Sequence, residues 1–168
     1  MGEPDAFADL MAADAGAFRT KFRKMAADPF AFYRGSACLF YADMATSEDR
    51  WCDERTSRVW IHGDLHAENF GTYMDANGRI VFDVNDFDEA YYAPFTWDLK
   101  RGATGFVIAA QEEGGHGRKQ QRRIAAAFVR GYVEAMRDYA TDATEQQGQM
   151  REDNAPKIIR RLFESAKE

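Results

Sequence analysis

Residues 62–87 read HGDLHAENFGTYMDANGRIVFDVNDF, and this stretch decides the fold that we expect for the chain. Near its middle the dipeptide Asn77-Gly78 separates two runs that are rich in aromatic and β-branched residues. Asn-Gly in this setting favours a β-hairpin with a two-residue type I′ turn, because that turn needs a positive φ at both central residues. The sequence therefore predicts an antiparallel hairpin whose open end joins two polar segments.

The register of this hairpin decides which polar residues meet. With a two-residue loop, cross-strand partners have numbers that add up to 155, so Asn69 faces Asp86 at the open end. Opposed residues of an antiparallel pair lie about 4.5–5.5 Å apart. An amide oxygen and a carboxylate then come within reach of one hard cation, which prefers oxygen ligands. Asp64 lies in the loop that enters the hairpin.

Phosphoryl transfer to a hydroxyl uses this combination of side chains: one aspartate, one asparagine and a second aspartate. The first aspartate accepts or orients the hydroxyl, and the other two residues hold divalent ions. The spacing from Asp64 to Asn69, D-x-x-x-x-N, also matches the protein-kinase catalytic loop. The stretch therefore favours kinase-like chemistry.

Two segments resemble the kinase-like small-molecule phosphotransferases of the aminoglycoside phosphotransferase and choline kinase type. HGDLHAEN (62–69) is similar to their H-G-D-x-x-x-x-N, and NDFDEAYYAPFTWDL (85–99) is similar to their D-F-D…G-P…D-L segment. The resemblance covers residues 58 to about 110. It implies that Asp64 is the catalytic base, that Asn69 and Asp86 bind Mg²⁺, that ATP is the donor, and that Asp98 braces the loop from the following helix.

A second resemblance is to a bacterial family named domain of unknown function 2252. It rests on DPFAFYRGSA (28–37), GDLHAENFG (63–71), FDVNDFDEA (82–90) and WDLKRGATG (97–105), and it spans most of residues 22–140. This resemblance implies no particular reaction.

Several candidate residues keep a simpler interpretation beside the functional one. Asp64 and Asn69 could cap the loop without chemistry, and His62 and His66 are more often structural than metal ligands. Asp98 could be a helix-start carboxylate favoured by the helix dipole.

The metal ligand and the phosphate contact also have alternatives. Asp83 and Asp88 compete with Asp86, because a register slip of one residue moves a side chain to the other face. Arg34 is a candidate phosphate contact for the nucleotide, although bracing of the loop is the simpler role.

We expect an α+β fold, a partial protein-kinase-like catalytic lobe that is mostly helical with a small β-hairpin. Apolar periodicity predicts helices over 5–27 and about 30–44, with Asp28 as a cap and Pro29 in the first turn, a strand at 58–61, and helices after residue 94. The expected parts are an N-terminal helical segment (1–57), a core with the catalytic loop (58–140), and a linker with a C-terminal helix (141–168), which we expect to begin a further part of the protein.

Composition narrows the class of protein. The 168 residues are 45% hydrophobic and 30% charged, which is typical of a globular domain. The net charge of −6 argues against a general nucleic-acid or membrane-surface binder, although a local basic patch is compatible with it. Cys38 and Cys52 lack metal-binding spacing, and we find no secretory signal and no apolar run of about 18 residues. We expect a cytoplasmic bacterial protein.

The function expected from the sequence is Mg²⁺-dependent transfer of a nucleotide phosphoryl group to a hydroxyl or amine of a small acceptor. The 61 residues before His62 contain no G-x-G-x-x-G and no V-A-I-K-like strand, so we expect this chain alone to be inactive. Two alternatives stay open. One is a non-catalytic kinase-like scaffold. The other is a metallophosphoesterase-like hydrolase suggested by GDLH, for which the chain offers only three histidines. The acceptor and the oligomeric state are not specified.

Overall fold

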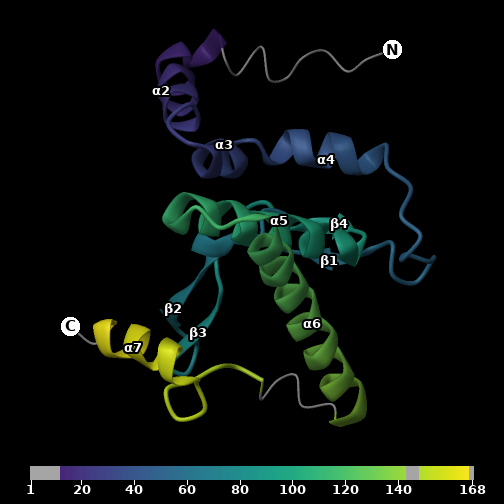
Figure 1. Cartoon of the computed structure of the whole chain (residues 1–168), viewed down its shortest axis with the longest axis vertical. Helices are drawn as coiled ribbons and strands as arrows, with labels where there is room; N and C mark the ends of the chain where they lie inside the picture. Colours follow the sequence, from purple (N-terminus) through teal and green to yellow (C-terminus); the bar gives the residue numbers. More distant parts are fainter. Residues whose placement is uncertain (1–11, 143–147, 167–168) are drawn as a thin grey trace. The chain divides into compact units, whose positions relative to one another are not determined.

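The computed structural model describes residues 12–142 and 148–166 (Figure 1). The chain is α+β and mostly helical, with two small antiparallel sheets, which confirms the predicted class at this level. It divides into a unit that ends at Ser47 and a unit that begins at Glu48. Arg34 belongs to the first unit, and all the other candidate residues belong to the second.

The first unit contains three helices, α2 (Ala15–Met25), α3 (Pro29–Gly35) and α4 (Ala37–Ala45). The Asp14 carboxylate caps α2 by accepting the backbone N–H of Ala17 at 2.9 Å. Residues 5–11 of the helix predicted over 5–27 lie outside the described residues. Asp28 caps α3 through the N–H of Ala31 at 2.7 Å, and Pro29 is the first helical residue, as predicted.

The single helix predicted over about 30–44 is wrong, because the chain breaks at Ser36 into α3 and α4. Ser36 has φ −113° and ψ 31°, and its hydroxyl donates back to the carbonyl of Tyr33 at 3.4 Å. Such local hydrogen bonds compete with helix propagation. A Cβ at Gly35 would clash with Cγ of Met25, so the glycine lets α2 approach the end of α3.

The second unit contains both sheets and the two longest helices. Its elements are β1 (Val59–Ile61), the 3₁₀ turn η1 (Ala67–Asn69), β2 (Phe70–Met74), β3 (Ile80–Val84), β4 (Tyr91–Ala93), α5 (Phe95–Gly114), α6 (Arg118–Asp142) and α7 (Lys157–Ser165). The strand predicted at 58–61 is confirmed, and it pairs antiparallel with β4, which the sequence did not predict. Helix α5 ends at Gly114, with Gly115 at φ 59° as its left-handed cap.

The hairpin forms between β2 and β3, but its predicted register is wrong by one residue. Phe70 pairs with Val84, so partner numbers add up to 154 rather than 155. Only Gly78 has a positive φ in the turn, at 73°, which rules out a type I′ turn at Asn77-Gly78. The N–H of Gly78 donates to the carbonyl of Asp75 at 3.0 Å, and the N–H of Asp75 donates to that of Arg79 at 2.8 Å. The loop therefore has three residues, 76–78.

The Asp75 side chain explains the three-residue loop. Its carboxylate accepts the N–H of Asn77 at 2.8 Å and that of Arg79 at 2.9 Å, and it forms an ion pair with the Arg79 guanidinium. A type I turn followed by a left-handed glycine suits these contacts, and it is the usual three-residue hairpin loop. As a result Asn69 is aligned with Asn85 and not with Asp86.

The C-terminal segment adds to this hairpin. The N–H of Phe82 donates to the carbonyl of Met150 at 2.8 Å, and α7 packs on the hairpin (yellow and teal in Figure 1). Ala155 and Phe163 bring apolar side chains that are 1% exposed, and Val81 on β3 is fully buried. The segment thus supplies part of the small core behind β3.

Asp49 fixes the start of α5 within the second unit. Its carboxylate accepts the Thr96 hydroxyl, the Lys100 ammonium at 2.8 Å and the N–H of Trp51 at 3.0 Å. Burial opposes ionisation of this group, but the hydrogen bonds from Lys100 and Thr96 outweigh it and lower the pKa of Asp49 to about 2. The ionised form therefore stabilises the folded state.

We expect Asp49→Asn to lower the free energy of unfolding at neutral pH by about 2 kcal/mol. Because the folded pKa is depressed, this contribution is fully present above the ordinary aspartate pKa of 3.8 and is lost as pH falls through about 2. Urea unfolding of both proteins from neutral pH down to about pH 2 measures it. A difference that stays constant across this range would show that the charge of Asp49 is not responsible.

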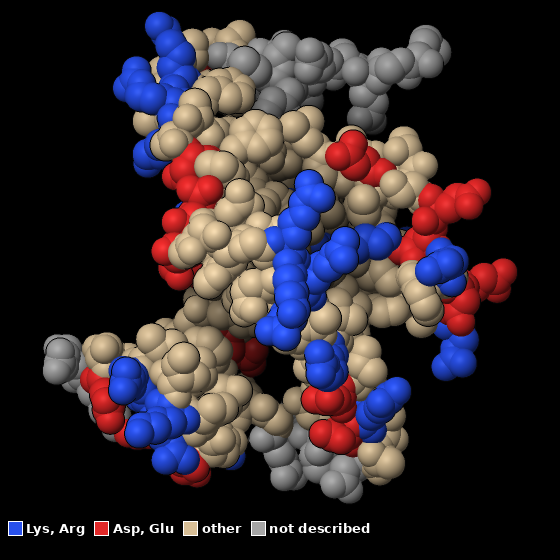
Figure 2. All heavy atoms as spheres, in the orientation of Figure 1, with Lys and Arg blue, Asp and Glu red and all other residues tan. Residues whose placement is uncertain are grey.

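Surface charge is uneven despite the negative net charge. Lys and Arg side chains gather over the first turns of α6 (Figure 2), where the sequence places Arg118, Lys119, Arg122 and Arg123. The Lys and Arg side chains of this group are all exposed. The chain therefore carries a local basic patch, which the net charge of −6 alone does not reveal.

Candidate functional site

The loop between β1 and η1, residues 62–66, is held against α5 by Asp98. The two carboxylate oxygens of Asp98 accept the backbone N–H of His62 at 2.7 Å and that of Gly63 at 3.0 Å. Gly63 has φ 88°, a conformation that favours glycine, and this turn presents both N–H groups to one side chain. Asp98 thus links the first turn of α5 to the loop.

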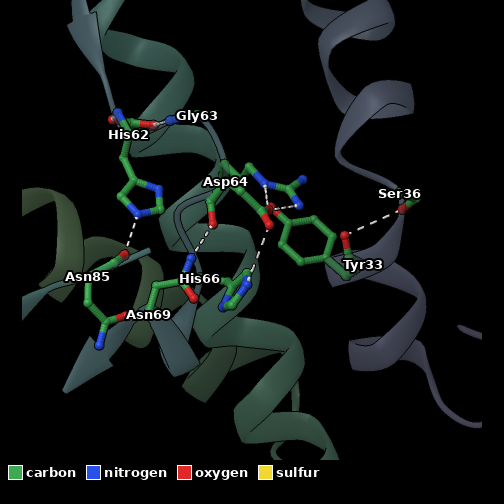
Figure 3. Close-up of polar contacts among 10 residues, drawn as sticks. Tyr33, Ser36, His62, Gly63, Asp64, His66, Asn69 and Asn85 are labelled. Carbon is green, nitrogen blue, oxygen red and sulfur yellow. Dashed lines mark hydrogen bonds and ion pairs between the residues drawn. The ribbon is translucent and has the colours of Figure 1, made fainter. Parts of the chain in front are cut away.

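Asp64 is the next residue after Gly63, and the side chains of Arg101 and His66 contact its carboxylate (Figure 3). Arg101 donates through Nε to Oδ1 at 2.8 Å, and its Nη2 also contacts this oxygen. His66 Nε2 lies 3.6 Å from the other oxygen, Oδ2. Arg101 is fully buried, whereas the Asp64 side chain is 19% exposed. Both carboxylate oxygens of Asp64 therefore have partners.

These contacts decide the charge of Asp64. Burial opposes its ionisation, but the hydrogen bond from His66 and the positive charge of Arg101 outweigh burial and hold the pKa of Asp64 below its usual range. Asp64 is consequently an ionised carboxylate at neutral pH.

Arg101 is a site residue that the sequence analysis missed. It lies three residues after Asp98, in WDLKRG, so both side chains project from one face of α5. The i, i+3 spacing of an acid and a base beside a loop motif was a usable signal. The two residues hold consecutive parts of one loop, Asp98 through its backbone and Arg101 through the carboxylate of Asp64.

Asn69 is buried at the end of the loop and links it to the hairpin. Its side-chain Nδ2 donates to the carbonyl of Asp64 at 3.0 Å, and its own carbonyl accepts the N–H of Asn85 at 2.9 Å (Figure 3). His62 Nε2 lies 2.8 Å from the carbonyl of Asn85, so this nitrogen carries the proton and donates. Asn85 therefore ties Asn69 and His62 together. The predicted register placed Asp86, and not Asn85, opposite Asn69.

Asp86 comes directly after Asn85 and has an unusual backbone. Its φ of 61° is the only positive φ at a non-glycine residue among those described. The residue is exposed, and its side chain makes no hydrogen bond or ion pair within the described part of the chain. A left-handed non-glycine residue costs about 1–2 kcal/mol, although aspartate tolerates it better than most. Such a conformation often marks a functional position.

The remaining candidates contribute less to this arrangement. Asp83 and Asp88 are exposed. Among the described residues, the Asp83 carboxylate accepts one hydrogen bond, from the N–H of its neighbour Val84 at 2.7 Å. The His62 ring contacts the carbonyl of Asn85, and the His66 ring contacts the carboxylate of Asp64. Arg34 lies in α3 of the first unit.

The described residues contain no group of three His, Cys, Asp or Glu side chains arranged to hold a metal ion. Asn69 and Asp86 together offer two ligands to a metal ion, fewer than such a group of three. Nδ2 of Asn69 is used by Asp64, so Oδ1 is the ligand atom that Asn69 can offer, and the Asp86 carboxylate is the second. Both are oxygen donors, which suit Mg²⁺ or Mn²⁺ better than Zn²⁺.

Residues 14–168 match the family described as "Uncharacterized protein conserved in bacteria (DUF2252)", and the chain belongs to this family. No curated protein and no solved structure matches the chain. None of the helices within the described residues is long and apolar enough to cross a membrane.

Proposed function

We propose that this chain carries the catalytic loop of a kinase-like, Mg²⁺-dependent phosphotransferase, which transfers a phosphoryl group from ATP to a hydroxyl or amine of a small acceptor. The observation that carries the proposal is the link through Asn85. This residue joins the loop that bears Asp64 and Asn69 to the strained position of Asp86. The three oxygen-bearing side chains that phosphoryl transfer uses thus come from one connected segment.

In this proposal Asp64 orients the acceptor hydroxyl and takes its proton. A carboxylate with a depressed pKa is a weak base, so it suits a reaction in which the proton leaves late. Phosphoryl transfer has this character, because its transition state is loose and depends mainly on positioning and charge. Arg101 and His66 hold the carboxylate in one orientation and thereby support the positioning role.

Asn69 and Asp86 would hold the metal ion in this proposal. A bound Mg²⁺ supplies positive charge that neutralises the phosphate oxygens. Asn69 is preorganised for this role by burial and by its bond to Asp64. Asp86 is exposed with an unengaged carboxylate, so it can reach a ligand without first breaking a contact within the described chain.

A non-catalytic scaffold is the second candidate, and one contact favours it. The ion pair between Asp64 and the fully buried Arg101 is also typical of a contact that only stabilises the fold. The two functions differ in metal and nucleotide binding, which a scaffold does not need.

Binding of Mn²⁺ to the chain, followed by electron paramagnetic resonance, tests the metal site. We expect weak binding that a non-hydrolysable ATP analogue strengthens, because such ions share their ligands with phosphates. Asp86→Asn should weaken this binding by about tenfold or more, which corresponds to 1.4 kcal/mol. The matched control is Asp88→Asn, which changes an exposed aspartate two residues away and should leave binding unchanged.

A further variant separates binding from folding. Asp86→Gly removes the same ligand and relieves the left-handed backbone, so it should keep or slightly raise the melting temperature while Mn²⁺ binding is lost. Equal effects of Asp86→Asn and Asp88→Asn would contradict the metal assignment. Tight Zn²⁺ binding that His66→Ala abolishes would favour the phosphoesterase-like alternative.

A further inference from the structure

One side of α6 carries a regular row of positive charge. Because each residue of an α-helix turns by about 100°, an arc of about 40° holds four cationic residues, which we call the basic face: Lys119, Arg123, Arg130 and Arg137. All four residues are exposed. The row is about 27 Å long, since each residue adds about 1.5 Å along the helix axis. It continues the basic patch of the first turns into the lower half of α6 (Figure 2).

The opposite side of α6 packs against α5. Phe128 and Tyr132 lie about half a turn round the helix from the row. Their rings contact those of Phe106 and Phe95, with centroids 5.3 Å and 6.2 Å apart. The packing of these two helices therefore leaves the basic face uncovered.

No ion pair compensates the charges of the basic face within the described residues. Lys119 and Arg123 are four positions apart, where like charges on a helix repel each other. The first turn of α6 contains no acidic residue, and the helix dipole disfavours cations at this end. Glu134 borders the face, four residues after Arg130, but it forms no ion pair in the described chain either. An anionic partner would therefore relieve repulsion that the described chain leaves in place.

The composition of the basic face favours a row of phosphates over an acidic protein. Three of its four cations are arginines, whose planar guanidinium groups match phosphate oxygens in pairs. The exposed residues between them on this face are Ala126 and Val133. Protein partners usually need larger apolar or aromatic anchors at the centre of an interface. Interfaces with nucleic acids are instead polar and strongly positive.

The shape of the row narrows the partner further. A flat anionic membrane would also meet Glu134 and Asp138, which are exposed beside the row and would be repelled. The basic face has no aromatic side chain on which an unpaired base could stack, a feature typical of single-strand binding. The major groove of B-DNA is about 12 Å wide and admits an α-helix, whereas that of an RNA duplex is too narrow. These features together favour duplex DNA.

We propose that the basic face of α6 binds duplex DNA through its phosphate backbone, with the helix lying along the major groove and without reading the base sequence. This binding is separate from the proposed phosphotransfer and does not depend on it. The chain as a whole carries a net charge of −6, so the attraction is local to α6. The binding is consequently weak and falls steeply as salt is added.

Fluorescence anisotropy of a short, labelled DNA duplex of random sequence, titrated with the protein at several sodium chloride concentrations, tests the proposal. We expect a dissociation constant of about 10⁻⁴–10⁻⁶ M near physiological salt, the usual range for binding without sequence preference. The logarithm of the binding constant should fall linearly with the logarithm of the salt concentration. Its slope should be about −3.6, because each of four phosphate contacts contributes about −0.9. Absence of binding at low salt would overturn the proposal.

Charge variants localise the binding. Arg123→Gln/Arg130→Gln removes two central charges of the basic face, so it should weaken binding about tenfold or more at low salt and bring the slope to about −1.8. The matched control, Lys21→Gln/Lys24→Gln, removes two exposed charges from α2 and should change neither quantity. Glu134→Gln removes the acid beside the face and should tighten binding. Glutamine suits a helix about as well as arginine or lysine, so all three variants should keep the helical circular dichroism of the wild type.

Other anionic partners serve as competing probes. Single-stranded DNA, an RNA duplex, polyglutamate and vesicles that contain phosphatidylglycerol are titrated at the same total concentration of negative charge. The DNA duplex should bind most tightly. Tighter binding of any of the other four probes would overturn the proposal, as would equal effects of the two double variants or weaker binding by Glu134→Gln.

Discussion

Replacing Arg101 by alanine is expected to lower the free energy of unfolding at neutral pH by about 3–5 kcal/mol. Arg101 is fully buried and donates through two nitrogens to one oxygen of Asp64. Without it, the Asp64 carboxylate stays in a largely buried position with only His66 nearby. Urea unfolding followed by tryptophan fluorescence gives the change in free energy.

The matched control for Arg101→Ala is Arg79→Ala. Arg79 also pairs with an aspartate, but its side chain is 52% exposed. Exposed pairs contribute about 0–1 kcal/mol, so this variant should cost far less. Arg101→Lys keeps the charge but loses the two-nitrogen contact, and its stability should lie between those of wild type and Arg101→Ala. Similar losses from Arg79→Ala and Arg101→Ala would contradict a buried ion pair.

The pH dependence of Arg101→Ala checks the physical cause. The folded pKa of Asp64 is depressed, so its ionised form contributes stability above the ordinary aspartate pKa, and this contribution is lost as pH falls through the lowered value. The stability difference between wild type and Arg101→Ala should therefore shrink as pH is lowered toward about 3. A difference that does not change with pH would point to lost packing of the arginine stem instead.

Replacing Asp64 by asparagine is expected to lower turnover by about 10²–10⁴-fold if the proposed phosphotransfer is correct. The change removes the group that orients the acceptor hydroxyl and accepts its proton. Nucleotide affinity should change little, because the proposed metal ligands Asn69 and Asp86 remain. The measurement is nucleotide-dependent transfer or hydrolysis by the longest natural form of the protein, with turnover normalised to the folded fraction.

The buried arginine makes a second effect of Asp64→Asn unavoidable. The variant leaves Arg101 buried without its counter-charge, so stability falls as well as turnover. The double variant Asp64→Asn/Arg101→Met separates the two effects, because it removes both charges and keeps a side chain of similar length. We expect it to recover most of the stability and none of the turnover. Recovery of turnover together with stability would show that Asp64 is structural, and the scaffold would then be the better description.

Local physical chemistry made several elements predictable from the sequence alone. Asp28 followed by Pro29 caps and starts α3, because the cap needs only a carboxylate and an unpaired backbone N–H in the first helical turn. Apolar periodicity predicts a helix after residue 94, and α5 begins at Phe95. The hairpin between two β-rich runs follows from a pattern that lies within one segment.

Other features were decided only by contacts between side chains in the folded protein. The hairpin register depends on the Asp75 carboxylate, which binds the turn N–H groups and replaces the two-residue loop that Asn-Gly favours. That shift of one residue aligned Asn69 with Asn85, which no pattern singled out. Arg101 and Asp64 lie 37 positions apart in sequence, and only the packing of α5 against the loop brings their charges together. Local propensity decides which elements form, whereas buried charge pairs and side-chain hydrogen bonds decide which residues face each other.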